Sequence, residues 1–197
     1  MNRLPLLTLA AAASLVAATA MAAPETYTFD STHTLPTFSV NHLGMSTVRG
    51  MFEGSTGKVT IDNAAKSGSV EVTIPTGTVF TGYLKSVGTG RTRDEHLRAA
   101  DFFNAAEFPT MVYKSTKFVY TGDKPSSIEG TLTLLGVTKP VTLKVDHFTC
   151  GPHPFNKKEM CGADLSGMIK RSDFGMKFGV PAVGDDVALA IAVEAYK

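Results

Sequence analysis

Apolar and polar residues alternate with a period of two over most of the chain after residue 23, which is the pattern of β-strands that bury one face. The clearest runs are residues 37–42, 58–62, 69–74, 110–120, 128–134, 141–145, 164–170 and 187–195. Turn-forming residues separate several of these runs, for example at 122–125 and 184–186. Many strands joined by short turns predict an all-β fold, either an antiparallel sandwich or a barrel.

One stretch departs from this alternation and predicts one or two short helices. Thr92 is followed three residues later by Glu95, which is the spacing of a helix capping box, and helix-forming residues continue to residue 100. Asp101 is placed to cap a second short turn over residues 102–106, and Pro109 would end that segment.

The last predicted strand is apolar on both faces. One face carries the large residues Val187, Leu189, Ile191 and Val193, and the other carries Ala188, Ala190 and Ala192. We interpret it as a barrel strand whose small-residue face borders an apolar lumen and leaves room there. The alternative is a sandwich strand within a tightly packed core.

The N-terminal segment predicts a signal peptide. Arg3 is the only charged residue before Glu25, an apolar stretch follows it, and residues 20–22 have the small-x-small pattern that signal peptidase cleaves. A membrane anchor is the alternative, but the apolar core is short and rich in alanine, whereas a spanning helix needs roughly 20 strongly apolar residues. We therefore expect a signal peptide at 1–22 and an exported, periplasmic domain at 23–197 without a stable membrane anchor.

The charge balance argues against nucleic-acid binding, and the two cysteines predict a disulfide. Nineteen Lys and Arg residues face eighteen Asp and Glu residues, so the chain lacks the basic surplus of a nucleic-acid-binding protein. Cys150 and Cys161 flank a turn-rich segment, and in an exported protein they predict a disulfide that pins a protruding loop, worth about 3 kcal/mol. The alternative is a metal site formed by both cysteines and His153, which lacks a clear fourth ligand.

Catalytic motifs are missing from the sequence. It contains no Gly-x-Ser-x-Gly elbow, no phosphate-binding glycine loop and no His-Glu-x-x-His. No carboxylate pair lies near His33 and His42 in the sequence, so we interpret these histidines, like the others, as structural. The remaining histidines are His96, His147 and His153.

Charged residues are dense in the predicted helical segment. They are Arg91, Arg93, Asp94, Glu95, His96, Arg98 and Asp101. We interpret most of them as an ion-pair network that caps the helix and fastens it to the sheet. The alternative is a site for a polar head group at the mouth of a barrel.

Short motifs spread in order over nearly the whole predicted domain resemble those of the YceI-like family. They are the segments 30–33, 38–44, 49–52, 81–82, 93–98, 101–103, 108–109, 130–141 and 171–176, together with Gly57. Leu135 stands where the family often has a polar residue or histidine, and the cysteine-bounded insert resembles one found in only part of the family.

The resemblance implies an extended, lipocalin-like barrel of eight antiparallel strands, whose apolar tunnel holds a polyisoprenoid or another long amphiphile. It also implies periplasmic secretion and no established catalytic residues, so we expect a lipid ligand and no cofactor. By alternation we expect Phe38, Val40 and His42 to face the lumen. The full set of expected ligand-binding residues is Phe38, Val40, His42, Phe52, Leu97, Phe102, Phe103, Met111 and Tyr113.

Two other functions remain open at this point. One is an enzyme or chaperone acting on isoprenoid quinones, with His42 as the titratable group facing the lumen. The other is a stress-response or adhesion module whose barrel is solidly packed and binds nothing. A homodimer is also left open.

Overall fold

The structure, a computed structural model, describes residues 23–82 and 90–197, so the predicted signal peptide lies outside the described residues. The strands are β1 (Glu25–Phe29), β2 (Leu35–His42), β3 (Ser46–Met51), β4 (Thr56–Asp62), β5 (Ser67–Pro75), β6 (Thr110–Thr121), β7 (Lys124–Leu134), β8 (Val137–Pro152), β9 (Glu159–Lys170) and β10 (Val183–Tyr196). The helical elements are α1 (Arg93–Arg98) and the 3-10 helices η1 (Thr76–Thr78) and η2 (Arg171–Phe174).

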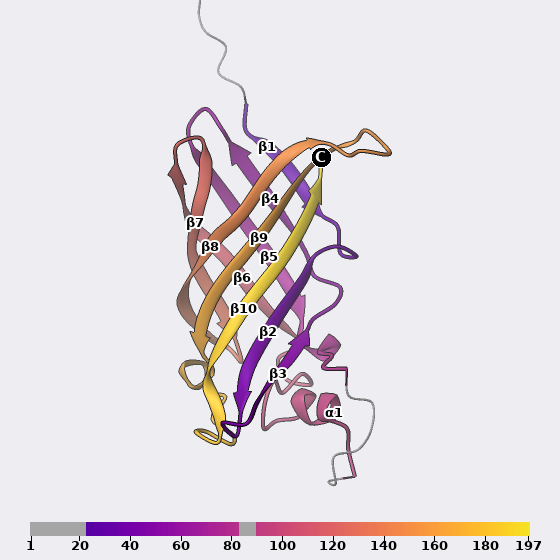
Figure 1. The fold of residues 1–197 in the computed structure, drawn as a ribbon, viewed down its shortest axis with the longest axis vertical. Helices are drawn as coiled ribbons and strands as arrows, with labels where there is room; N and C mark the ends of the chain where they lie inside the picture. Colours follow the sequence, from indigo (N-terminus) through magenta and orange to yellow (C-terminus); the bar gives the residue numbers. More distant parts are fainter. Residues whose placement is uncertain (1–22, 83–89) are drawn as a thin grey trace, which may run out of the picture.

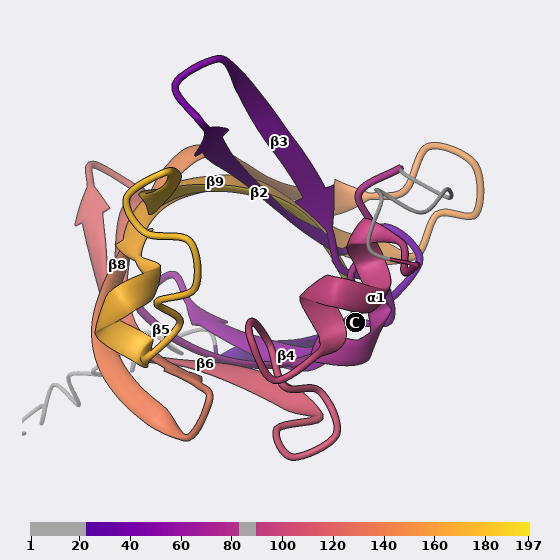
Figure 2. The same ribbon diagram turned by 90° about the horizontal axis from the view of Figure 1, so that it is seen from below.

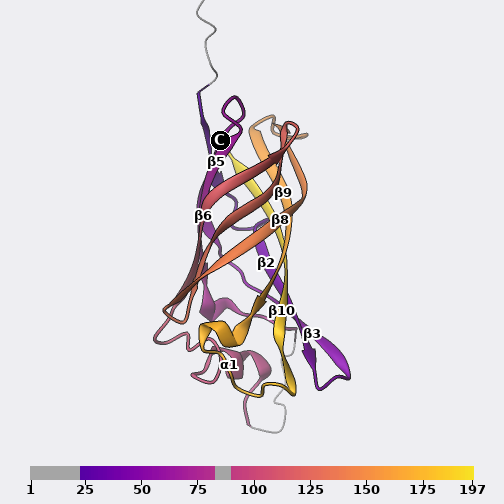
Figure 3. The same ribbon diagram turned by 90° about the vertical axis from the view of Figure 1, so that its left-hand side faces the viewer.

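Eight of these strands close an antiparallel barrel, as the family resemblance implies. The order is β1-β4-β5-β6-β7-β8-β9-β10, and β10 pairs back to β1 (Figure 1). The strands are strongly tilted, and α1, η2 and the start of β10 lie at one end of the barrel, which we call the α1 end (Figure 3). Long strands with a tilt of about 35–45° produce an elongated barrel.

The strands β2 and β3 are additional to this barrel. The C-terminal part of β10 pairs with β1 up to Phe29↔Ala195, and the rest of its edge pairs with β2 down to His42↔Val183. β1 and β2 thus follow one another along β10, while β3 leans away from the wall at the α1 end (Figure 2). A backbone bridge between Met51 and Phe80 joins the end of β3 to the segment that precedes α1.

All eight predicted strands are present, and most are longer than the alternation indicates. β1 and β3 were not predicted. Their sequences, ETYTF and STVRGM, carry few apolar residues. β1 is stabilised by pairing with β4, and β3 by pairing with β2. Pairing of this kind is not visible in the local alternation of apolar and polar residues.

The helical segment contains one α-helix. Thr92 and Glu95 form the predicted capping box at the start of α1. Residues 102–106 form hydrogen-bonded turns and no second helix. Its predicted cap, Asp101, instead accepts hydrogen bonds from Arg91 (3.2 Å) and His96 (3.0 Å).

The prediction for the last strand must also be corrected. Val187, Leu189 and Ile191 face the lumen, and the alanines between them face outward, so the small-residue face is outside. Burying a large branched side chain stabilises the fold more than burying alanine does. The barrel is wide enough to take these side chains and still enclose a cavity.

The end opposite α1 carries the disulfide. Cys150 and Cys161 are direct partners in the register of β8 and β9 and are joined by a disulfide, with a Cα–Cα distance of 4.0 Å. This confirms the predicted pairing and removes both thiolates from the alternative metal site. The loop between the strands protrudes from the barrel (Figure 1). Within residues 23–82 and 90–197, no helix has the length and apolar character needed to cross a membrane.

Candidate functional site: an apolar cavity inside the barrel

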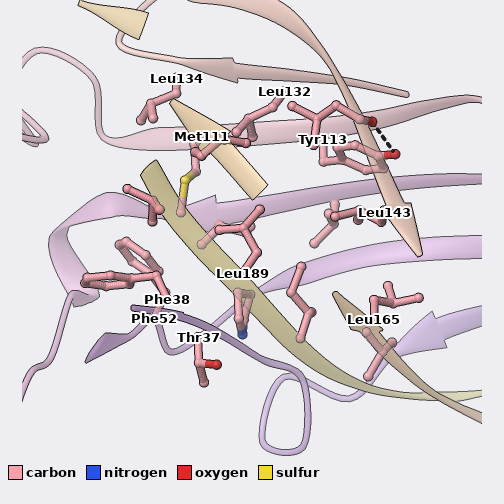
Figure 4. A pocket seen from close by; sticks show the side chains of 18 of the residues that line it. Thr37, Phe38, Phe52, Met111, Tyr113, Leu132, Leu134, Leu143, Leu165 and Leu189 are labelled. Atoms are coloured by element: carbon pink, nitrogen blue, oxygen red, sulfur yellow. Dashed lines mark hydrogen bonds between the residues drawn. The ribbon is translucent and has the colours of Figure 1, made fainter. Parts of the chain in front are cut away.

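A cavity of about 590 Å³ occupies the barrel interior. Its lining on β10 extends from Val183 to Ala195, which is about 40 Å along the strand, or about 30 Å along the barrel axis after the tilt is allowed for. Figure 4 shows aliphatic, aromatic and sulfur-containing side chains converging on it from several strands. The polar or ionisable side chains along its described wall are Thr34, Thr37, His42, Arg93, His96, Tyr113 and Arg171.

Two β-bulges keep the wall apolar. The lining residues Met111 and Tyr113 on β6 would put Lys117 on the same face if alternation continued, but a register shift between Ser115 and Lys117 turns Phe118 inward instead. On β8, a shift between Val145 and His147 likewise brings Phe148 to the lumen and leaves His147 exposed. An extra residue in one strand reverses the facing of all that follows.

Tyr113 contributes its ring to the wall, while its hydroxyl is hydrogen bonded away from the lumen. That hydroxyl donates toward the backbone carbonyl oxygens of Ile128 (3.0 Å) and Val141 (3.2 Å). Burial raises the pKa of Tyr113 to about 12. The hydroxyl therefore stays protonated at neutral pH, and its polarity is already satisfied by the barrel wall.

A three-ring cluster closes one side of the cavity where β2 and β3 leave the barrel. Phe38 of β2 lies 5.7 Å from Phe52 and 6.5 Å from Phe103, and the latter two rings are 5.2 Å apart at 89°. Phe52 follows β3 and Phe103 follows α1, so the cluster fastens the segment after α1 to the additional strands. Edge-to-face contacts of this kind orient aromatic rings as well as burying them.

A second group of rings lies at the α1 end. The ring centroids of His96, Phe102 and Phe178 are 4.9 to 5.4 Å apart. Phe178, from the connection between η2 and β10, is half exposed, and it is the one exposed residue among the described residues that line the cavity. The cavity therefore reaches the surface beside Phe178.

The charged residues of the α1 segment act mainly in structural contacts, as predicted. Asp94 is buried and accepts hydrogen bonds from the backbone nitrogen (3.0 Å) and hydroxyl (2.6 Å) of Thr81. The hydrogen bond from His96, followed by that from Arg91, lowers the pKa of Asp101. Arg93 and His96 also line the cavity, so this segment supplies polar groups at the α1 end of the cavity.

Arg171 is a lining residue that the sequence did not single out. It is buried, and its guanidinium donates to the backbone carbonyl oxygens of Gly184 (2.8 Å), Val183 (2.8 Å) and Met176 (3.1 Å). Burial lowers the pKa of this guanidinium. In the sequence, Arg171 stood out only as the first residue of the motif at 171–176. That motif does not predict which backbone carbonyls the guanidinium contacts.

The nine residues expected to bind a ligand all line the cavity. His42 lies at the α1 end, where β2 finishes, and Leu97 lies on α1. Their contact with a ligand stays a prediction. Much of the cavity wall formed by β7 to β9 was not predicted, including Leu132, Leu143 and Leu165. The alternation of apolar residues in these strands was the pattern that could have identified them.

A polar cluster bridges the break between β1 and β2 and gives His33 two carboxylate neighbours, one of them distant in sequence. The imidazole Nδ1 of His33 lies 2.8 Å from Asp30 Oδ2 and 3.9 Å from Glu194 Oε2. These ligand-type atoms lie within 4.8 Å of one another, a set that could hold a divalent ion. In the structure they pair with one another and fasten the break to β10.

Comparison with known proteins places the fold. The model of the YceI-like domain matches residues 27–195. Protein YceI from Salmonella arizonae is 37% identical over 185 residues, covering 92% of each chain. BcnA from Burkholderia cenocepacia superposes with a TM-score of 0.69 at 21% identity, over 85% of this chain and 99% of BcnA. A polyisoprenoid binding domain from Saccharophagus degradans superposes with a TM-score of 0.59 at 16% identity, over 86% and 97%.

The sequence motifs, the closed barrel and these matches agree over almost the entire described chain. Eight strands close around an apolar cavity, and two additional strands and the α1 segment complete its wall at one end. The chain belongs to the YceI-like family.

Proposed function

We propose that this protein binds one long apolar amphiphile in the barrel cavity, of the polyisoprenoid or isoprenoid-quinone class, and stores or carries it in the periplasm. The observation that carries the proposal is the cavity of about 590 Å³ with its almost wholly apolar wall. A cavity of this size lies within the range of about 300–1,000 Å³ that is usual for ligand pockets.

The lining explains how such a ligand would be held. Each methylene that leaves water contributes about 0.8 kcal/mol, so a long tail gains its affinity without directional bonds. The basic lining residues His42, Arg93, His96 and Arg171 all belong to elements at the α1 end. We infer that the tail lies along the barrel and that the polar head lies at this end.

The family and the solved neighbours support the same class of ligand. The barrel from Saccharophagus degradans is described as a polyisoprenoid binding domain, and it shares the fold of this chain. The cavity chemistry found here suits a ligand of that kind. It also disfavours the solidly packed module, since a packed barrel would leave no such cavity.

Binding is favoured over catalysis by the contacts of two of the ionisable lining groups. His96 is hydrogen bonded to Asp101, and Arg171 is occupied by three backbone carbonyls. Because their polar atoms are bound to protein partners, these side chains serve to order the cavity wall. We therefore propose a carrier or storage protein and not an enzyme, which acts as a monomer or, if copies pair, as a homodimer with one cavity in each barrel.

The test is organic extraction and mass spectrometry of the protein purified from a bacterial periplasm without detergent. We expect a prenyl quinone, prenol or similar amphiphile at close to one per chain. Ala163→Trp, which places an indole in the cavity, should reduce the extracted lipid severalfold. Ala192→Trp is the matched control, because Ala192 faces outward on β10. Equal lipid in both variants, or none in the parent protein, would refute the proposal.

A further inference from the structure

We propose that the α1 end of the barrel docks on the surface of a phospholipid bilayer that contains anionic lipid, with Leu43, Met45 and Phe178 inserted among the lipid chains. This inference rests on the proposed function, since a carrier of a membrane lipid must meet the bilayer that supplies or receives it.

Exposed apolar side chains are concentrated on two loops at this end. Of the seven exposed large hydrophobic residues in the described chain, four lie here: Leu43 and Met45 in the turn between β2 and β3, and Phe178 and Val180 in the connection from η2 to β10. Met45 is 88% exposed and Phe178 is 50% exposed. Clustered exposed apolar residues indicate an interaction surface.

The two loops form one continuous surface. The backbone nitrogen of Leu43 donates to the carbonyl oxygen of Ala182 at 2.8 Å, next to the β2–β10 register pair His42↔Val183. The tip itself is ordered by Asn41, whose side-chain oxygen accepts a hydrogen bond from the Gly44 nitrogen at 2.7 Å. Leu43 and Met45 are therefore carried on a hydrogen-bonded turn that is joined to the segment before β10.

The charge of these loops selects the partner. The segments 41–51 and 174–184 contain no Asp or Glu, and their fully charged residues are Arg49 and Lys177, both exposed. Three aspartates adjoin the second segment: Asp186 is paired with Lys170 (2.7 Å), Asp185 accepts a hydrogen bond from Ser172, and Asp173 is exposed. Apolar insertion flanked by cations suits a bilayer with anionic headgroups. At the opposite end, the exposed Phe155 lies in a loop close to Lys157, Lys158 and Glu159 and has no such apolar neighbours among the exposed large residues.

The cavity opens onto this surface. Phe178 belongs both to the cavity wall and to the exposed loop, and its ring packs against His96 and Phe102, which also line the cavity. A lipid tail that passes Phe178 moves from the bilayer into the cavity beside apolar groups. The docking surface and the binding site are therefore connected.

The absence of tryptophan from the sequence allows a clean test. Met45→Trp and Phe155→Trp place a single fluorophore at opposite ends of the barrel, on positions that are 88% and 89% exposed. With vesicles of phosphatidylethanolamine and phosphatidylglycerol, we expect a blue shift for Met45→Trp and quenching by brominated acyl chains. Phe155→Trp should keep the emission of a hydrated indole. With pure phosphatidylcholine vesicles the shift should be smaller.

A second experiment uses loss of binding. The double variant Leu43→Ser, Met45→Ser should reduce the vesicle-bound fraction in sedimentation by about tenfold or more, whereas Phe155→Ser should not change it. The substituted side chains are exposed, so thermal unfolding should be unaffected.

The proposal is wrong if Met45→Trp shows no shift with vesicles, if both indoles shift equally, or if Met45→Trp shifts with protein concentration alone, which indicates pairing with a second copy. The amount of lipid extracted from the same preparation distinguishes loss of docking from loss of cavity binding, because only the second removes the bound lipid.

Discussion

The ring of Tyr113 packs so closely on Gly130 that a β-carbon at Gly130 would stand 2.5 Å from the Tyr113 hydroxyl oxygen and 2.5 Å from the carbonyl oxygen of Lys114. The missing side chain lets the ring of Tyr113 lie against the barrel wall (Figure 4). Its hydroxyl donates toward the carbonyls of Ile128 and Val141. Glycine at this point of β7 therefore shapes the cavity as well as the strand.

Gly130→Ala should destabilise the barrel by about 1–3 kcal/mol, because both the ring and the backbone must move. Urea unfolding measures the effect. Gly151→Ala is the matched control, since a β-carbon there meets nothing within 4 Å, and it should be close to neutral. Similar free energies of unfolding for the two variants would show that the contact does not matter.

Tyr113→Phe should cost about 1 kcal/mol, because it removes the donor to Ile128 and Val141 while keeping the ring. The cavity wall stays intact, so the amount of extracted lipid should not change. A large loss of lipid with unchanged stability would instead place the hydroxyl in contact with the ligand.

Replacement of Arg171 by Met should lower the free energy of unfolding by about 2–3 kcal/mol, since the carbonyls of Gly184, Val183 and Met176 lose a charged donor. Arg171→Lys should restore little, because one ammonium cannot reproduce the fork of the guanidinium. Hydrogen exchange of the loop that carries Phe178 should rise in both variants. Full rescue by lysine would contradict this account.

The cluster of Asp30, His33 and Glu194 should make stability depend on pH. The hydrogen bonds from Thr32 and then His33 lower the pKa of Asp30 to about 2 from 3.8, so its contribution is present above about pH 4 and is lost as the pH falls toward about 2. The hydrogen bond to Asp30 raises the pKa of His33 above 6.5. Its contribution is complete below about pH 6.5 and is lost as the pH rises through the raised pKa.

The variant His33→Gln tests this window. The difference in free energy of unfolding from the parent protein should be largest near about pH 5 and smaller on both sides. Asp30→Asn should reduce the loss on the alkaline side, where the charge of Glu194 still raises the pKa of His33. Urea titrations at about pH 3, 5 and 9 measure it. A difference that does not vary with pH would contradict the pairing.

The disulfide should stabilise the end opposite α1. Replacing both Cys150 and Cys161 by Ala opens a short loop between β8 and β9 and should cost about 2–3 kcal/mol. The same loss should follow reduction of the parent protein, measured by urea unfolding with and without dithiothreitol. If reduction leaves the unfolding midpoint unchanged, the bond does not contribute in solution.

Local chemistry in the sequence determined a large part of this protein. A period of two marks eight strands because side chains of a strand alternate between two faces, and the spacing of Thr92 and Glu95 marks the start of α1 because a capping box needs only four residues. The ordered motifs indicated the family, and Cys150 with Cys161 indicated the disulfide.

Tertiary structure decided which faces line the cavity and which polar groups meet. Bulges before Lys117 and His147 reverse the alternation, and closure of the barrel puts the large face of β10 inside, because pairing between strands sets the phase of each strand. His33 meets Glu194 across 161 positions of sequence. Contacts between residues so far apart depend on how the barrel closes, and no local pattern records that closure.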